Sequence, residues 1–130
     1  MQDILGTIQG NWKAQNQPNP KSELTLMGIV HNNIDPSIGI IGVAGVISNH
    51  GSIDFAPQHS GLTNREPSEV TANGEVYCYQ SGSHKQVSSA PAIQGRILIQ
   101  LIDGKTLKAE HQEKSCDEGL YFSSPTIYER

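Results

Sequence analysis

The chain has 130 residues, which is the length of one domain and too short for two independent cores. Only 17% of the residues are charged, the net charge is −4, and nine residues are Lys or Arg. Such a chain has no basic stripe to displace counterions, which argues against nucleic-acid binding, and its modest net charge argues against disorder. We therefore expect residues 1–130 to fold as a single domain with a small core.

Short runs in which apolar and polar residues alternate follow one another along the whole chain. Thirteen Gly and seven Pro interrupt the sequence, and no stretch of ten residues free of them carries the apolar pattern of a helix. The alternation is typical of strands. We predict strands at residues 6–13, 23–31, 38–48, 51–56, 68–72, 75–80, 93–102, 105–111 and 120–129.

Three of the predicted turns share one pattern, in which Gly is the third residue. They are Asn49-His50-Gly51, Ala72-Asn73-Gly74 and Ile102-Asp103-Gly104. The pattern suits a three-residue hairpin loop, because Gly readily adopts the left-handed conformation that closes such a loop. Hairpins in series form a meander, and closing a meander leaves no exposed edge. We predict an all-β domain that forms a single antiparallel up-and-down or partly open barrel of about eight strands, with a β-sandwich as the alternative.

A three-residue loop also fixes which side chains face each other across a hairpin. In the last hairpin it sets Ile99 opposite Leu107 and Arg96 opposite Glu110, which gives one apolar face and one face with an ion pair. The same reasoning gives the pairs Val70–Val76 and Ile47–Ile53. The inward rows predicted in this way are Leu24, Leu26, Ile53, Phe55, Val76, Cys78, Ile97 and Ile99.

The motif Gly10-Asn11-Trp12 opens the first predicted strand, and Arg130 ends the last one. These two ends resemble the calycins, the lipocalins and fatty-acid-binding proteins, in which a Trp closes one end of the barrel and a basic residue on the last strand packs over it. The resemblance implies that Arg130 packs over Trp12. The Pro-rich residues 17–20 depart from the family, because they cannot form the helical lid of the fatty-acid-binding proteins. The alternative interpretation is that Trp12 is an ordinary core aromatic.

Cys78 and Cys116 are the only cysteines, an even count that permits one disulfide. In the predicted meander, the strand with Cys78 ends at Gln80, and the strand that ends at His111 returns to the same end of the sheet. Cys116 follows in the next loop, so both thiols lie at that end. We predict a disulfide between them, and the alternative is two free thiols in a reducing cytosol.

The candidate binding residues lie in a long loop at residues 57–67, and a second long loop covers residues 81–92. Loops of about a dozen residues are often functional. Arg65 offers a planar fork to a carboxylate or a sugar hydroxyl, and its neighbours both donate and accept hydrogen bonds. The alternative is a solvated connection in which Arg65 pairs with Glu66 or Glu69. The predicted ligand-binding residues are His59, Asn64, Arg65 and Glu66.

The sequence lacks the glycine motifs of nucleotide-binding proteins, Gly-x-Ser-x-Gly and His-Glu-x-x-His. None of its five histidines lies two or four residues from another, so we expect no metal site. From the missing motifs we expect no cofactor, and we assign no catalytic residue. The predicted function is a non-catalytic, extracytoplasmic β-barrel module that binds a small amphipathic molecule or a protein. The alternatives are a small hydrolase or cyclase that uses loop His and Glu residues, and a structural accessory domain of a larger secreted protein.

The longest apolar run, residues 38–47, is interrupted by Gly and is too short to cross a bilayer. The N-terminus has neither the basic region nor the apolar region of a signal peptide. The low charge and the many Asn, Gln and Ser residues are typical of exported domains. We therefore expect a mature secreted or periplasmic chain without its signal peptide, and a cytoplasmic protein is the alternative.

Overall fold

The computed structural model describes residues 3–15, 26–48, 50–81 and 91–130. These residues form an all-β fold, as predicted, with a short 3-10 helix, η2 (Pro67–Glu69), between the fourth and fifth strands. The strands are β1 (Gly10–Ala14), β2 (Leu26–His31), β3 (Gly39–Val43), β4 (Gly51–Phe55), β5 (Tyr77–Gln80), β6 (Arg96–Asp103), β7 (Thr106–Gln112) and β8 (Thr126–Glu129).

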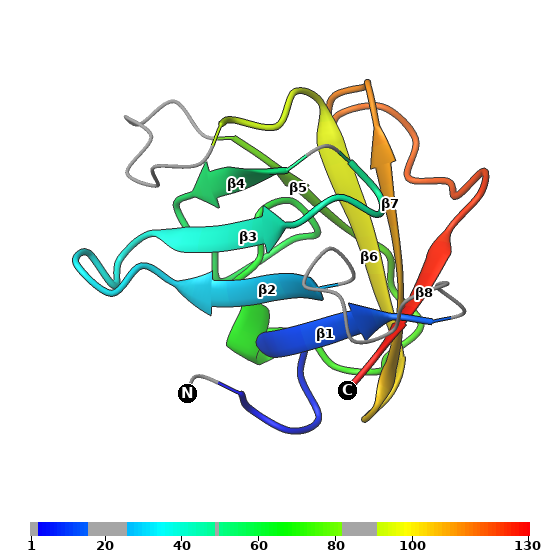
Figure 1. The fold of residues 1–130 in the computed structure, drawn as a ribbon, viewed down its shortest axis with the longest axis horizontal. Coiled ribbons are helices and arrows are strands. Elements are labelled where there is room, and N and C mark those ends of the chain that lie inside the picture. Colours follow the sequence, from blue (N-terminus) through cyan, green and yellow to red (C-terminus); the bar gives the residue numbers. More distant parts are fainter. Residues whose placement is uncertain (1–2, 16–25, 49, 82–90) are drawn as a thin grey trace.

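The strands form one sheet in the order β4-β3-β2-β1-β8-β7-β6-β5, and all neighbours are antiparallel. Two meanders, β1 to β4 and β5 to β8, are joined where β8 pairs with β1. Figure 1 shows β1 to β4 running across the view, with β6 to β8 crossing them steeply. Because β4 and β5 also contact each other, the sheet closes almost completely into a barrel, which confirms the predicted fold.

The edges of β4 and β5, the two strands at the seam of the barrel, are covered by loop segments. The Ser52 amide in β4 donates a hydrogen bond to the Pro91 carbonyl, and the Ser52 carbonyl accepts one from the Ile93 amide, both at 2.9 Å. The Cys78 amide in β5 donates a hydrogen bond to the Leu62 carbonyl, and the Cys78 carbonyl accepts one from the Asn64 amide, both at 2.8 Å. Unpaired strand edges invite pairing with other chains, and these parallel bridges satisfy part of each edge.

Large side chains fill the interior of the barrel. Trp12, Phe55, Tyr79 and Tyr128 are all fully buried there, and every strand from β1 to β8 contributes at least one residue to this core. The rings of Phe55 and Tyr79 lie 5.0 Å apart, and the Phe55 ring packs so closely on Gly39 that a Cβ there would overlap it. The interior is therefore a packed core, as is usual for a barrel of eight strands.

The predicted strand at residues 68–72 is wrong. Pro67 begins η2, and the Glu66 carboxylate caps this helix by accepting hydrogen bonds from Ser68. Val70 is buried in the core, and its carbonyl accepts a hydrogen bond from the Ile8 amide at 3.2 Å. The predicted pair Val70–Val76 therefore does not form.

Strand β3 is also shorter than predicted, because it ends at Val43, which pairs with Gly51. The chain then leaves the sheet, and Val46 and Ile47 pack against the core from the loop. The predicted pair Ile47–Ile53 is therefore wrong. The turn predicted at residues 49–51 includes Asn49, which lies outside the described residues.

The hairpin of β6 and β7 forms, but its register differs by two residues from the prediction. Leu101 pairs with Leu107, and Arg96 pairs with Gln112 instead of Glu110. A register shift between Leu101 and Asp103 tightens the turn, and the Asp103 side chain accepts a hydrogen bond from the Lys105 amide at 2.8 Å. Because side chains alternate with period two, a shift of two residues leaves the apolar face unchanged.

Four of the predicted inward residues lie in the core: Ile53, Phe55, Ile97 and Ile99. Leu26 is 42% exposed, because Met27 and Ile29 occupy the inner face of β2, one residue out of step with the prediction. Val76 and Cys78 pack against Leu98 and Cys116 in a separate small cluster. Leu24 lies outside the described residues.

Candidate functional site

Two of the predicted binding residues, His59 and Arg65, meet at the carboxylate of Glu69. The His59 Nδ1 lies 2.5 Å from Glu69 Oε2, and Arg65 Nε donates to Glu69 Oε1 at 2.9 Å. These hydrogen bonds, that of His59 first, hold the pKa of Glu69 below its usual value. Arg65 Nη1 also donates to the Gly61 carbonyl at 3.1 Å. The alternative interpretation, in which Arg65 pairs with Glu69, therefore describes a contact that the structure contains.

The other two predicted residues attach the same segment to the barrel. The Asn64 Oδ1 accepts a hydrogen bond from the Gln80 amide at 2.9 Å, at the end of β5. The Glu66 Oε1 lies 2.6 Å from Nε2 of His31, at the end of β2. Burial raises the pKa of Glu66, but hydrogen bonds from Ser68 and His31 outweigh it and lower the pKa. Ligand binding by all four residues stays a prediction.

The contact between Trp12 and Arg130 that the calycin resemblance implies is present. Trp12 is 1% exposed, and its indole donates a hydrogen bond to the Ile8 carbonyl at 2.9 Å. The guanidinium carbon of Arg130 lies 4.1 Å from the centre of the Trp12 rings. Arg130 also donates to the carbonyls of Thr7 and Gln9, so it fastens the segment before β1 to the last strand. Both residues have a structural role here.

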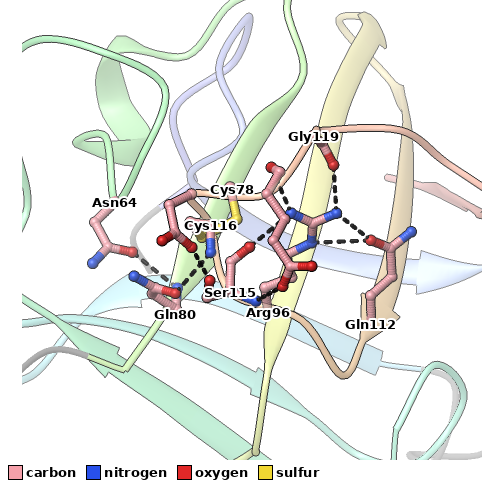
Figure 2. The surroundings of a disulfide bond; sticks show 10 residues. Asn64, Cys78, Gln80, Arg96, Gln112, Ser115, Cys116 and Gly119 are labelled. Atoms are coloured by element: carbon pink, nitrogen blue, oxygen red, sulfur yellow. Dashed lines mark hydrogen bonds between the residues drawn. A yellow bond between two sulfur atoms is a disulfide. The ribbon is translucent and has the colours of Figure 1, made fainter.

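The predicted disulfide between Cys78 and Cys116 is confirmed, with the two Cα atoms 5.7 Å apart. It joins β5 to the loop at residues 113–119, which follows β7 and is called the 113–119 loop below. The disulfide packs with Leu98 of β6 in the small cluster, separate from the barrel core. Gln80 adds a second link, because its Oε1 accepts a hydrogen bond from the Cys116 amide at 2.9 Å (Figure 2).

Arg96, the first residue of β6, holds the same loop from the other side. It is 0% exposed, and Figure 2 shows its guanidinium surrounded by acceptors. Its Nε and Nη2 donate to Gln112 Oε1 at 3.0 and 2.6 Å. Its Nη1 donates to the carbonyls of Ser115 and Glu118 at 2.8 and 3.0 Å, and Nη2 donates to that of Gly119 at 2.7 Å. All five guanidinium N–H groups are thus used.

Glu110 continues this polar network toward β8. The Gln112 Nε2 donates to Glu110 Oε2 at 2.8 Å, and Glu110 Oε1 accepts from the amides of Ser123 and Ser124, both at 2.8 Å. Burial raises the pKa of Glu110, but these hydrogen bonds and the charge of Arg96 outweigh it and lower the pKa. The network fixes the backbone on both sides of the 113–119 loop.

An open pocket of about 730 Å³ lies against the 113–119 loop. Its other walls come from the end of β5 and from the segment that leads into β6. The segment that leads into β6 lies close to the start of the 113–119 loop at Gly95, where φ is 86° and a Cβ would overlap the Gln112 carbonyl. A volume of this size is usual for small-molecule sites. The lining residues are Gln80, Ser81, Ala92, Ile93, Gln94, Gly95, Glu113, Lys114, Ser115 and Glu118.

This pocket is not evident from the sequence. Its residues come from three separate segments, and Glu113 and Lys114 look like a solvated turn when read alone. The positive φ of Gly95 and the two cysteines are the signals that mark this end of the barrel. The loop predicted at residues 81–92 lies mostly outside the described residues, but its last positions, Pro91 and Ala92, pair with β4.

Comparisons of the chain with protein-family models, curated proteins and solved structures gave no match. Among the described residues, no group of three or more His, Cys, Asp or Glu side chains is arranged to hold a metal ion. No helix in the described ranges has the length and apolar character needed to span a membrane. The function is therefore inferred from the geometry of the site.

Proposed function

We propose that this protein is a non-catalytic binding module that takes a small amphipathic ligand in the pocket beside the 113–119 loop. The observation that carries the proposal is that this pocket has a fixed frame and a mixed lining. Ala92, which is exposed, supplies apolar surface beside the buried Ile93, while Gln80 and Gln94 offer amide groups. Pockets for small molecules combine apolar surface with a few polar groups in this way.

The frame supports this choice of site over the interior of the barrel, which large side chains fill. Arg96 and the Cys78–Cys116 disulfide hold the loop that forms one wall, so little of it needs to be ordered when a ligand binds. A site that is formed in advance binds more tightly, because less conformational entropy is lost.

The contacts of the loop histidines favour binding over catalysis. A serine nucleophile needs a neighbouring base within hydrogen-bond reach, and that base is usually a histidine. Here the Ser68 hydroxyl donates to Glu66 at 2.9 Å, while His31 contacts the other oxygen of the same carboxylate. His59 contacts Glu69. In both pairs the histidine is held by a carboxylate and supports the 57–70 segment.

An extracytoplasmic location, secreted or periplasmic, belongs to the same proposal. Its support is the disulfide, since disulfides form and persist mainly in oxidising compartments. A relationship to the calycins is supported by the Gly-x-Trp start and by the packing of Arg130 over Trp12. A calycin-like barrel that binds its ligand at a loop end is the combination that we propose.

The test is a screen of small amphipathic compounds against the oxidised, isotope-labelled protein, followed by NMR. Binding should shift the amide signals of Gln94, Gly95 and Lys114. Gln94→Ala removes one amide side chain and keeps the backbone carbonyl that accepts from His111, so it should weaken binding about fivefold, the effect of about 1 kcal/mol. His59→Ala is the matched control and should leave the affinity unchanged. Ligands that shift only the signals of the 57–70 segment would overturn the choice of site.

A further inference from the structure

The pocket contains opposite charges that the rest of the described chain leaves unpaired. Glu113 and Lys114 both line it, and neither side chain forms an ion pair or hydrogen bond with the described residues. Adjacent Glu and Lys residues on a surface loop are common. Here, however, they share a concave site with a fixed wall, so both charges are available to one ligand.

Glu118 supplies a second carboxylate on the same wall. Its Oε2 accepts a hydrogen bond from the Ser115 amide at 3.0 Å, which holds the side chain against its own loop. The other oxygen, Oε1, has no partner among the described residues. The wall therefore presents one ammonium group and two carboxylates, of which one is fixed in place.

Arg96 adds no further positive charge that a ligand in the pocket can contact. Its guanidinium lies behind the wall, is 0% exposed, and donates all five N–H groups to Gln112 and to loop carbonyls. It has no donor left for a ligand. Among the described lining residues, Lys114 is the one cation that a ligand anion can reach.

We propose that this pocket binds a small zwitterion, a molecule that carries an ammonium group, a carboxylate group and an apolar part. The carboxylate pairs with Lys114, the ammonium group pairs with Glu113 or Glu118, and the apolar part lies on the exposed Ala92. A short peptide with free ends has this chemistry, and a pocket of about 730 Å³ has room for one. The proposal rests on the proposed function, because it names the ligand class of that same pocket.

Four forms of one dipeptide separate the contributions of the two charges. The probes are leucyl-leucine, its C-terminal amide, its N-acetyl derivative, and the N-acetyl amide, which has no charge. Their dissociation constants are measured from the NMR shifts of the pocket amides at pH 7 and low salt. An exposed ion pair contributes up to about a fivefold change in affinity. Each singly charged form should therefore bind about fivefold more weakly than the zwitterion, and the neutral form about 25-fold more weakly.

Protein variants assign each charge of the ligand to its partner. Lys114→Gln should remove the difference between the zwitterion and its amide. The double variant Glu113→Gln/Glu118→Gln should remove the difference between the zwitterion and its N-acetyl form. Lys105→Gln is the control, because Lys105 lies in the β6–β7 turn at the far end of β6, and it should change neither difference.

Four outcomes would decide against the zwitterion, and the last of them would also decide against the proposed function. Equal affinity for all four dipeptide forms, with the pocket signals shifting, would overturn it and leave the proposed function standing. The zwitterion is also wrong if Lys114→Gln preserves the preference for a carboxylate. If the dipeptides leave the pocket signals unchanged while other amphipathic compounds shift them, the zwitterion is wrong and the site is right. If no compound shifts these signals, the proposed function fails as well.

Discussion

Replacing Arg96 with Met should lower the free energy of unfolding by about 3–5 kcal/mol, because it leaves several acceptors around the guanidinium without a donor. Met has a similar volume and no donors, so the change removes five hydrogen bonds and little packing. The Gln112 side chain and the carbonyls of Ser115, Glu118 and Gly119 lose their partner together.

The magnitude follows from opposing contributions. A hydrogen bond to a charged group stabilises a protein by about 1.5–3 kcal/mol, so five of them set an upper limit of roughly 7–15 kcal/mol. The variant also avoids the cost of burying a guanidinium, which amounts to several kcal/mol. In addition, the loop carbonyls lie near the surface and regain water. The balance is well below the upper limit and well above the effect of a surface ion pair.

Urea unfolding of the oxidised protein at pH 7 measures this loss. Arg65→Met is the matched control, because Arg65 also donates to a side-chain oxygen and a backbone carbonyl but is partly exposed to solvent. Its loss should stay below about 1 kcal/mol. Hydrogen exchange at the Cys116 amide should become faster in Arg96→Met than in Arg65→Met. A loss below about 1 kcal/mol for Arg96→Met would refute the role given to the buried guanidinium.

Two further predictions concern the same end of the barrel. Cys78→Ala/Cys116→Ala should lower the free energy of unfolding by about 4 kcal/mol, from the entropy of a loop with a separation of 38 residues; thiol titration of the unreduced, unfolded wild type should find no free thiol, and two would contradict the disulfide. Because folding lowers the pKa of Glu110, its carboxylate stabilises the protein above the unfolded pKa of about 4.3, and this stabilisation disappears as the pH falls through the folded pKa. The wild type should therefore melt at a higher temperature than Glu110→Gln at pH 7, and this difference should become smaller at pH 3. A difference that stays constant between the two pH values would count against this linkage.

The barrel could be predicted because period-two patterns survive errors in detail. The β6–β7 register differs by two residues from the prediction, yet Ile97, Ile99 and Leu101 remain on the inner face. Strand β2 shows the limit of this reasoning, because Leu26 competes with Met27 and Ile29 for that face. When apolar residues occupy both odd and even positions of a strand, the pattern does not show which set faces inward, and tertiary packing decides it.

The disulfide could also be predicted, because chain direction alone places Cys78 and Cys116 at one end of a meander. Arg96 could not be assigned its role in the same way. The predicted register places it on the polar face opposite Glu110, and three of its partners are backbone carbonyls, which carry no sequence signature. The predicted 57–67 residues show the opposite problem, since their polar side chains have partners within the chain.

The two long connections therefore serve the barrel differently. Residues 62–64 cover the edge of β5, and the side chains around them are bonded to β2, β5 and one another. Residues 91–93 cover the edge of β4 through their backbone. The next residue, Gln94, lines the pocket. Because Ala92 and Ile93 both pair with β4 and line the pocket, the shape of the pocket depends on closure of the barrel. A ligand held there would contact the segment that covers the seam, so binding and closure should stabilise each other.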